Sequence, residues 1–202
     1  DIIVWMIENE QKTEAVKVVT ALARFFRISL SRGKSLITVK DELEHVRNYL
    51  MIQQMRFKNK FTYTIESDDE VLELASLKLM LQPLVENAIF HGLEPKGGHG
   101  SVLLDISIDP ATGDVLLRLT DDGIGMPPEQ VAHLLDAPTG EKEKAEKFRH
   151  VGLWNVNRRI QYSFGEAYGL TIESEEGIGT EVTIRLPYQK KGNDHAADLT
   201  CG

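Results

Sequence analysis

The spacing of apolar residues changes at about Asn59, and this change divides the 202-residue chain into two parts that cannot share one kind of secondary structure. Before it, Val16, Val19 and Phe26 recur at intervals that place them on one face of a helix. After it, residues 61–65 alternate between apolar and polar side chains, which is the period of a half-buried strand. The chain is therefore predicted to begin with helices and to continue as a mixed part.

The first part, residues 1–58, is predicted to form a helical hairpin. Helical periodicity covers residues 2–30 and 39–57, and residues 31–35 between them carry a turn signal. A hairpin of this length cannot bury its apolar stripe alone, so it should pack on a partner, most simply a second copy in a homodimer. His45, on the second helix, is predicted to lie at a surface or an interface.

Residues 59–189 are predicted to form an α/β (α+β) two-layer sandwich, in which one sheet carries helices on one face. The expected strands lie in residues 61–65, 102–108, 115–120, 170–173 and 181–186. The expected helices lie in residues 77–91, in residues 152–164 and in a short stretch that begins at 127–129. Gly92 is predicted to end the first of these helices. Residues 190–202 are polar and lack periodicity, so they are predicted to be a flexible tail.

The composition argues against several classes of function. Asp and Glu outnumber Lys and Arg by 31 to 23, and the formal net charge of −8 speaks against a general nucleic-acid-binding surface. The single cysteine, Cys201, allows no disulfide within one chain, which fits a reducing compartment. No apolar run approaches the ~20 residues that a membrane-spanning helix requires. An acidic chain can still bind a polyanion through a local site.

Residues 81–92 form the first cluster that could carry chemistry. On a helix, Asn87 and His91 are four residues apart and share a face, so an amide oxygen could face a metal and an imidazole could face a phosphate. A core helix with two surface polar residues explains the pattern about equally well. Glu86 could assist metal or proton handling, or it could be an ordinary exposed carboxylate.

Asp121 marks the second cluster, because it stands at the end of an expected strand. Gly123 and Gly125 come after it, and two glycines at this spacing let a flat ligand approach the backbone closely. The carboxylate could accept a hydrogen bond from an exocyclic amine. A calcium loop or a simple turn is the alternative, although Ile124 and Met126 do not supply the further ligands that an EF-hand needs.

Two more glycine-containing segments complete the set. Gly152 opens a helix, whose free backbone N–H groups and positive dipole end would suit a phosphate. The turn at residues 177–179 leads through Thr180 into the last strand. Without a ligand, the first segment is an ordinary helix start and the second is a plain hairpin.

In their order and spacing, the four clusters resemble the N, G1, G2 and G3 boxes of the Bergerat ATP-binding fold of gyrase, heat-shock chaperones, histidine kinases and MutL. The resemblance covers about residues 61–187. It implies ATP and Mg²⁺ as cofactors and a mobile ATP lid over residues 136–149. The residues that it places at the nucleotide are Asn87, Asp121, Gly123, Gly125, Met126, Gly152, Leu153 and Thr180.

The resemblance also implies which part of the nucleotide each group would contact. Asn87 would chelate Mg²⁺, and Asp121 would accept a hydrogen bond from the adenine amine. Gly123 and Gly125 would shape the adenine pocket, with Met126 beside them.

On the phosphate side, Gly152 and Leu153 would close the site around the triphosphate. Thr180 would support the nucleotide from the sheet. Glu86 and His91 are the predicted catalytic residues, His91 through a phosphate contact.

Pro83 distinguishes this chain from relatives that activate water. Gyrase-like and chaperone-like ATPases carry a glutamate four residues before the metal-binding asparagine, and Pro83 occupies that position here. A prolyl ring cannot act as a base, so transfer of the phosphoryl group to a separate nucleophile is favoured over hydrolysis.

Residues 41–44, 49–57 and 81–88 resemble sensor histidine kinases of the LytS/YehU type. That resemblance implies transfer of the ATP γ-phosphate to a histidine, and from there to an aspartate of a response-regulator receiver domain. The acceptor histidine of that family lies in a Pro-His-Phe segment, which does not occur in this sequence. Residues 1–6 resemble the stretch directly after that segment, so the acceptor is expected upstream of Asp1. The family further implies the cytoplasmic portion of a membrane-anchored bacterial protein.

Two other functions stay open at this point. A gyrase- or MutL-like ATPase would turn over ATP to gate its dimerisation, but Pro83 and the helical hairpin speak against it. A non-catalytic dimerisation module would keep the hairpin and lose the nucleotide site, but all four boxes retain their key residues.

Overall fold

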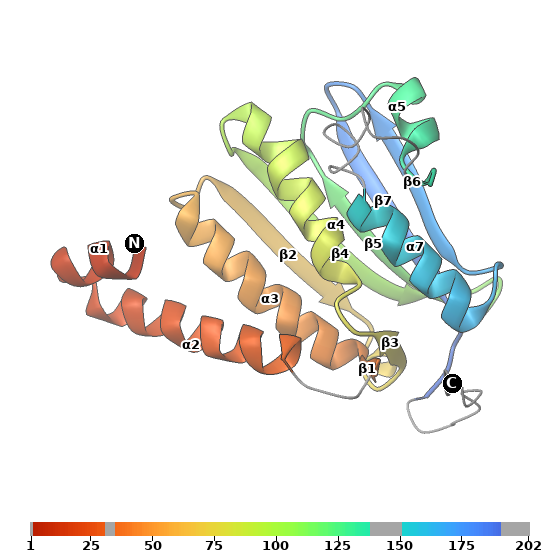
Figure 1. The fold of residues 1–202 in the computed structure, drawn as a ribbon, viewed down its shortest axis with the longest axis horizontal. Helices are drawn as coiled ribbons and strands as arrows, with labels where there is room; N and C mark the ends of the chain where they lie inside the picture. Colours follow the sequence, from red (N-terminus) through yellow and green to blue (C-terminus); the bar gives the residue numbers. More distant parts are fainter. Residues whose placement is uncertain (1, 31–34, 138–150, 191–202) are drawn as a thin grey trace.

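The computed structural model describes residues 2–30, 35–137 and 151–190. In this part of the chain, a pair of long helices leads into a sheet that carries helices on one face (Figure 1). Most of the predicted turn at 31–35, most of the predicted lid and the predicted tail beyond residue 190 lie outside the described residues.

The first predicted helix is divided in two. α1 (Ile2–Glu8) and α2 (Lys12–Ser29) are separated at Glu10, which has a φ of +60°. The break turns α1 back along α2 and brings Met6 against Val18, so that Met6 is only 5% exposed. The prediction of one continuous helix was therefore wrong, because the burial of this small apolar cluster outweighs helical continuity.

β1 (Leu36–Thr38) and α3 (Val39–Arg56) complete the N-terminal part, and the second predicted helix is confirmed. α3 begins with a capping box, in which Thr38 Oγ1 accepts from the Asp41 N–H at 3.1 Å and Asp41 Oδ2 accepts from the Thr38 N–H at 3.3 Å. β1 pairs in the antiparallel sense with β3 (Ala75–Leu77) and so ties the hairpin to the second part. Neither of these three-residue strands was predicted.

The main sheet has five strands in the order β2-β4-β5-β7-β6. The strands are β2 (Phe61–Ser67), β4 (Gly100–Ile108), β5 (Val115–Asp121), β6 (Gly169–Glu175) and β7 (Gly179–Leu186). β2 runs parallel to β4, and the other neighbours are antiparallel. α3, α4 (Leu81–Asn87) and α7 (Val151–Phe164) cover one face of this sheet (Figure 1). The predicted two-layer sandwich is confirmed.

The helix predicted at residues 77–91 begins later and ends later than expected. Leu77 belongs to β3, and α4 starts only at Leu81. After Asn87 the chain continues as a π-helical turn, η2 (Ala88–Leu93), and as a 3₁₀ turn, η3 (Glu94–Lys96), with Gly97 in the left-handed conformation as its C-cap. Gly92 therefore lies inside the helical run and does not end it.

One hydrophobic core spans both predicted parts of the chain. Val46 and Leu50 of α3 are fully buried in the same cluster as Phe61 of β2 and Leu84 of α4. The second helix of the hairpin is thus an integral layer of the sandwich. A domain boundary near residue 58 stays a prediction, since the core is continuous across it.

His45 lies inside this helical layer. Its ring is fully buried, stacks on Phe25 of α2 with 4.4 Å between the ring centroids, and shares a 2.9 Å hydrogen bond between Nε2 and Gln82 Oε1 of α4. The predicted surface or interface position is therefore wrong, because the ring is buried inside the chain between α2 and α4. Burial lowers the pKa of His45, although the hydrogen bond to Gln82 opposes this shift.

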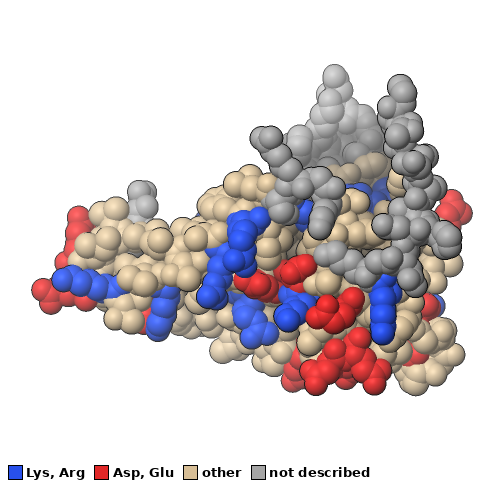
Figure 2. All heavy atoms as spheres, turned by 90° about the horizontal axis from the view of Figure 1, so that it is seen from below, with Lys and Arg blue, Asp and Glu red and all other residues tan. Residues whose placement is uncertain are grey.

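Figure 2 shows one face on which Lys and Arg side chains are interspersed with Asp and Glu side chains. Among the described residues, no helix combines the length and the hydropathy needed to cross a bilayer.

Candidate functional site

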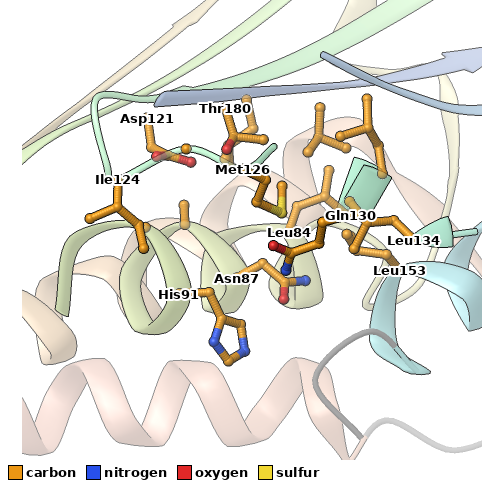
Figure 3. A pocket seen from close by; sticks show the side chains of 16 residues that line it. Leu84, Asn87, His91, Asp121, Ile124, Met126, Gln130, Leu134, Leu153 and Thr180 are labelled. Atoms are coloured by element: carbon orange, nitrogen blue, oxygen red, sulfur yellow. The ribbon is translucent and has the colours of Figure 1, made fainter. Parts of the chain in front are cut away.

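A pocket opens between the helical layer and the end of the sheet at which β5 finishes (Figure 3). Its walls come from α4 and η2, from the segment after β5, and from α5 (Pro128–His133), which lies beyond that segment in the chain. The start of α7 and the strands β6 and β7 close the remaining sides. Elements that are distant in the sequence therefore meet at this one place.

Asp121 is the buried charged group of the pocket. It is the last residue of β5, it is 6% exposed, and its Oδ1 accepts a hydrogen bond from the Gly123 N–H at 2.8 Å. Burial raises the pKa of Asp121 to about 6, while the Gly123 N–H acts to lower it and neighbouring Asp122 adds to the rise. At neutral pH the group is a carboxylate that can accept a hydrogen bond from a ligand amine.

Gly92 and Gly123 allow η2 to lie directly against the segment after Asp121. A Cβ on Gly92 would stand 2.6 Å from Asp121 Oδ1, and a Cβ on Gly123 would collide with the Gly92 backbone. The Ile124 N–H also donates to the Gly92 carbonyl at 3.0 Å. The two backbones pack so closely that neither position accepts a side chain, and this contact fixes the carboxylate at the pocket.

Gly125 and Met126 continue the segment along the pocket. Gly125 has a φ of +62°, and a Cβ there would collide with the Glu175 carbonyl of β6. The Met126 N–H donates to Ser174 Oγ at 2.9 Å, and its side chain points into the pocket (Figure 3). Thr180 is paired with Asp121 in the sheet and has its Oγ1 2.9 Å from Ser174 Oγ. The predicted adenine-side residues are thus brought together.

Asn87 and His91 both line the pocket from the helical side, as their spacing predicted. The Asn87 side-chain amide donates to the Pro83 carbonyl at 2.8 Å, so the amide nitrogen is engaged and the oxygen is the atom left for a ligand. His91 lies at the exposed edge, and Figure 3 shows its ring turned away from Asp121. It lies on the π-helical turn, a rare geometry that recurs at functional sites.

Glu86 is not among the residues that line the pocket. Its Oε1 accepts from the Gln82 side-chain amide at 2.8 Å. Burial raises the pKa of Tyr49 on α3, and the charge and hydrogen bond of Glu86 add to that rise. Glu86 therefore faces α3, and the catalytic role predicted for it has no support from the pocket geometry. That role stays a prediction.

Leu153 and Gly152 belong to the first turn of α7. Leu153 is 3% exposed and lines the pocket, and Gly152 lies close to Pro83 of α4, where a Cβ would stand 3.3 Å from the Pro83 Cβ. The N-terminal end of α7 therefore lies beside the helix that carries Asn87. The predicted lid at 136–149 falls almost entirely outside the described residues.

Sequence reasoning missed most of the apolar lining and one polar residue. The missed apolar residues are Leu84, Ala88, Leu119, Ile124, Leu134, Ile172 and Val182. Helical and strand periodicity marked several of these residues as core, but periodicity does not distinguish the wall of a pocket from its packed surroundings. Gln130 lines the pocket from α5 and had no signal in the sequence.

The metal-ligating groups of the pocket suit a cation that takes most of its coordination from a bound ligand and from water. Among the described residues, no group of three or more His, Cys, Asp or Glu side chains could hold a metal ion alone. Mg²⁺ often takes only one or two ligands from the protein and completes its coordination with water and substrate phosphates. The Asn87 oxygen fits a single ligand of that kind.

Comparison with known proteins gives two family matches. Residues 73–190 match the family described as histidine kinase-, DNA gyrase B- and HSP90-like ATPase, and residues 1–61 match the histidine kinase family. The two matches together cover the hairpin and every wall of the pocket.

Individual relatives extend over both parts. The chain is 36% identical over 183 residues to sensor histidine kinase YesM of Bacillus subtilis (strain 168), and 32% identical over 183 residues to sensor protein LytS of the same organism. These alignments cover 91% and 89% of this chain but only 29% and 30% of the relatives. The chain thus spans about three tenths of the length of the curated relatives it matches.

Solved structures agree in fold. A histidine kinase domain of a blue-light activated histidine kinase from Erythrobacter litoralis aligns with a TM-score of 0.52 at 18% identity, covering 90% of this chain and 83% of that chain. The catalytic domain of histidine kinase ThkA aligns with a TM-score of 0.56 at 17% identity, covering 76% and 95%. At these identities, the likeness shows that the fold is shared.

Proposed function

We propose that this chain, which belongs to the histidine kinase-, DNA gyrase B- and HSP90-like ATPase family, is the ATP-binding catalytic part of a two-component sensor histidine kinase. Its sensor histidine kinase relatives align over about nine tenths of its length. The pocket binds ATP with Mg²⁺. The γ-phosphoryl group passes to a histidine, and then to an aspartate on a response-regulator receiver domain.

The buried carboxylate of Asp121 is the observation that carries this proposal. It is buried at the pocket, is held by the Gly123 N–H, and is kept at its position by the close contact between Gly92 and Gly123. A carboxylate in such a place costs stability, since desolvation penalises its charged form, and binding of a ligand donor offsets that cost. An adenine amine is a donor of the right kind, and the apolar walls around it suit a purine ring.

On the phosphate side, Asn87 would supply one amide oxygen to Mg²⁺, and the ion would offset the negative charge of the phosphates. His91 at the edge of the pocket contacts a phosphate, and the N-terminal end of α7 faces the same charge. Gly152 leaves room for this approach, and Leu153 closes the wall behind it.

Transfer is favoured over hydrolysis by the chemistry of α4. Pro83 is a proline in the first turn of the helix, its carbonyl is occupied by the Asn87 amide, and it offers no proton acceptor for an attacking water. A gyrase- or MutL-like ATPase needs such an acceptor. The matches to sensor histidine kinases over both parts of the chain also favour transfer.

The hairpin provides a surface for a partner. Val16, Val19 and Phe26 of α2 are each half or more exposed, and so is its C-cap residue, Leu30. A second copy of the chain covers this stripe and forms a homodimer. The receiver domain docks separately, and the whole protein is a membrane-anchored bacterial sensor of which this chain lies in the cytoplasm.

The proposal is tested by isothermal titration calorimetry with Mg·ATP. Asp121→Asn is expected to weaken binding by about 1–3 kcal/mol, because the amide presents a donor to the adenine amine and leaves it unpaired. Asp105→Asn is the matched control, since Asp105 lies on β4 outside the pocket, where it pairs with Arg118. An Asp121→Asn protein that binds Mg·ATP as tightly as the control would exclude Asp121 from adenine recognition.

A further inference from the structure

α3 and α4 meet along a contact that contains buried polar side chains. We define the α3–α4 contact by Glu42 and His45 on α3 and by Gln82 and Glu86 on α4. His45 Nε2 lies 2.9 Å from Gln82 Oε1, and the Gln82 amide donates to Glu86. None of the four residues lines the pocket, so nucleotide binding alone does not account for them.

Glu42 is the most deeply buried of these groups. Its side chain is fully buried, Oε1 accepts from the Leu81 N–H at 2.8 Å, and Oε2 accepts from the Leu79 N–H at 3.0 Å. Both carboxylate oxygens therefore hold backbone groups of a different element. Burying a carboxylate in a core costs desolvation free energy, so a buried carboxylate that accepts two backbone hydrogen bonds indicates a specific structural role.

The groups that Glu42 holds are the N–H of Leu81, the first residue of α4, and the N–H of Leu79, which precedes the N-cap residue. The N-cap residue, Met80, makes no side-chain capping hydrogen bond, and Leu79 before it has a φ of +60°, which is unfavourable for a leucine. Free N–H groups in the first turn of a helix need acceptors from elsewhere. Glu42 supplies them from α3 and stabilises the strained conformation of Leu79.

α4 and the π-helical turn after it form the helical side of the pocket wall. Leu84 and Asn87 line the pocket, and the π-helical turn after them packs against Asp121. Asn87 lies six residues beyond Leu81, which is about 9 Å along a helix axis. A displacement at the start of a rigid helix of that length is transmitted to Asn87 with little loss.

We propose that Glu42 is a positioning residue for nucleotide binding, which acts from the hairpin helix by fixing the start of α4 and thereby the place of Asn87 in the pocket. This inference rests on the proposed function, because it concerns the affinity of the same site for Mg·ATP. It makes the second helix of the hairpin part of the machinery that sets that affinity.

The test is the Mg·ATP dissociation constant at pH 8, measured by calorimetry for the whole chain and for three variants. Glu42→Gln keeps the shape of the side chain but turns an amide donor toward one of the two N–H groups. Its affinity is expected to fall about tenfold, which corresponds to the loss of one buried hydrogen bond to a charged acceptor. Glu44→Gln removes the same charge two residues away at an exposed position and should bind like the wild type.

A general loss of stability is separated from positioning by Val115→Ala. Val115 is 1% exposed and lies at the end of β5 that is opposite Asp121, so its truncation lowers the melting temperature without touching α4. The proposal requires Glu42→Gln to lose more affinity than Val115→Ala at a comparable melting temperature. Equal losses, or an unchanged affinity in Glu42→Gln, would overturn it.

If Glu42→Gln does not fold, the same titration is made on Glu42→Gln with Leu79→Gly. Glycine accepts a positive φ without strain, so this second substitution is expected to recover stability while the carboxylate is still absent. Weak binding by this double variant supports the positioning role, and wild-type affinity rejects it. A wild-type chain that does not bind Mg·ATP at all would reject the proposed function instead, which keeps the two failures distinct.

Discussion

At the scale of single residues, Ser174 holds three parts of the pocket together. Its hydroxyl accepts from the Met126 N–H, donates to the Gly179 carbonyl and lies 2.9 Å from Thr180 Oγ1. The segment after β5 and the start of β7 are therefore joined through one side chain of β6. No sequence pattern selects this serine, because its partners are 5 to 48 residues away and only the sheet brings them together.

Ser174→Ala is expected to destabilise the protein by about 1–3 kcal/mol and to weaken Mg·ATP binding, because the Met126 N–H loses its acceptor and the pocket wall loosens. Thermal unfolding and calorimetry measure the two effects. Ser107→Ala, on β4 and outside the pocket, is the matched control. If both variants bind Mg·ATP equally, Ser174 does not organise the pocket.

The site residues that could be predicted are those whose role is indicated by neighbouring residues in the sequence. Asp121 with Gly123 and Gly125 was found because closely spaced glycines after an expected strand are a local signal. Gly92 was assigned to the wrong role, since only its contact with Asp121 across the layers explains why it lacks a side chain. Glu42 entered the sequence analysis only within residues 41–44, because no local pattern reveals that its partners are the N–H groups of Leu79 and Leu81.

At the scale of elements, long periodic segments were predicted well and junctions were not. α3, α7 and the five main strands have periods that extend over several residues. β1 and β3 have three residues each, which is too short to show a period, and their pairing displaces the start of α4 to Leu81. The break at Glu10 was missed because it depends on the tertiary burial of Met6.

The exposed apolar stripe of α2 leads to a prediction about assembly. Phe26→Glu with Val19→Glu is expected to shift the chain from dimer to monomer, because two charges replace apolar area that a second copy would bury. Sedimentation equilibrium measures the change. Thr20→Glu adds a charge at an exposed position beside the stripe and should leave the dimer intact. A wild-type chain that is already monomeric at all concentrations would rule out this dimer.

At the scale of the whole molecule, stability depends on acids that the fold buries in its helical layer and in its pocket. Burial raises the pKa of Glu42 from 4.5 to about 7, although the N–H groups of Leu81 and Leu79 act against the shift. The folded state therefore holds a proton that the unfolded chain has already released. For such a group, the favourable contribution to folding is complete below pH 4.5 and is lost as the pH rises to about 7. Burial also raises the pKa of Asp121 from 3.8 to about 6, so its favourable contribution to folding is likewise lost as the pH rises through this range.

The pH dependence of unfolding isolates the contribution of Glu42. Between pH 5 and pH 8, the wild type is expected to lose about 2–3 kcal/mol of stability relative to Glu42→Gln, since each unit of pKa difference corresponds to about 1.4 kcal/mol. The comparison is made as a difference at each pH, because His45, whose pKa is lowered, contributes with the opposite sign in both proteins. Urea unfolding at four pH values measures it. If the difference in unfolding free energy between the wild type and Glu42→Gln stays constant from pH 5 to pH 8, Glu42 titrates as an ordinary carboxylate. The buried acid in the α3–α4 contact would then contribute nothing to the pH dependence of folding.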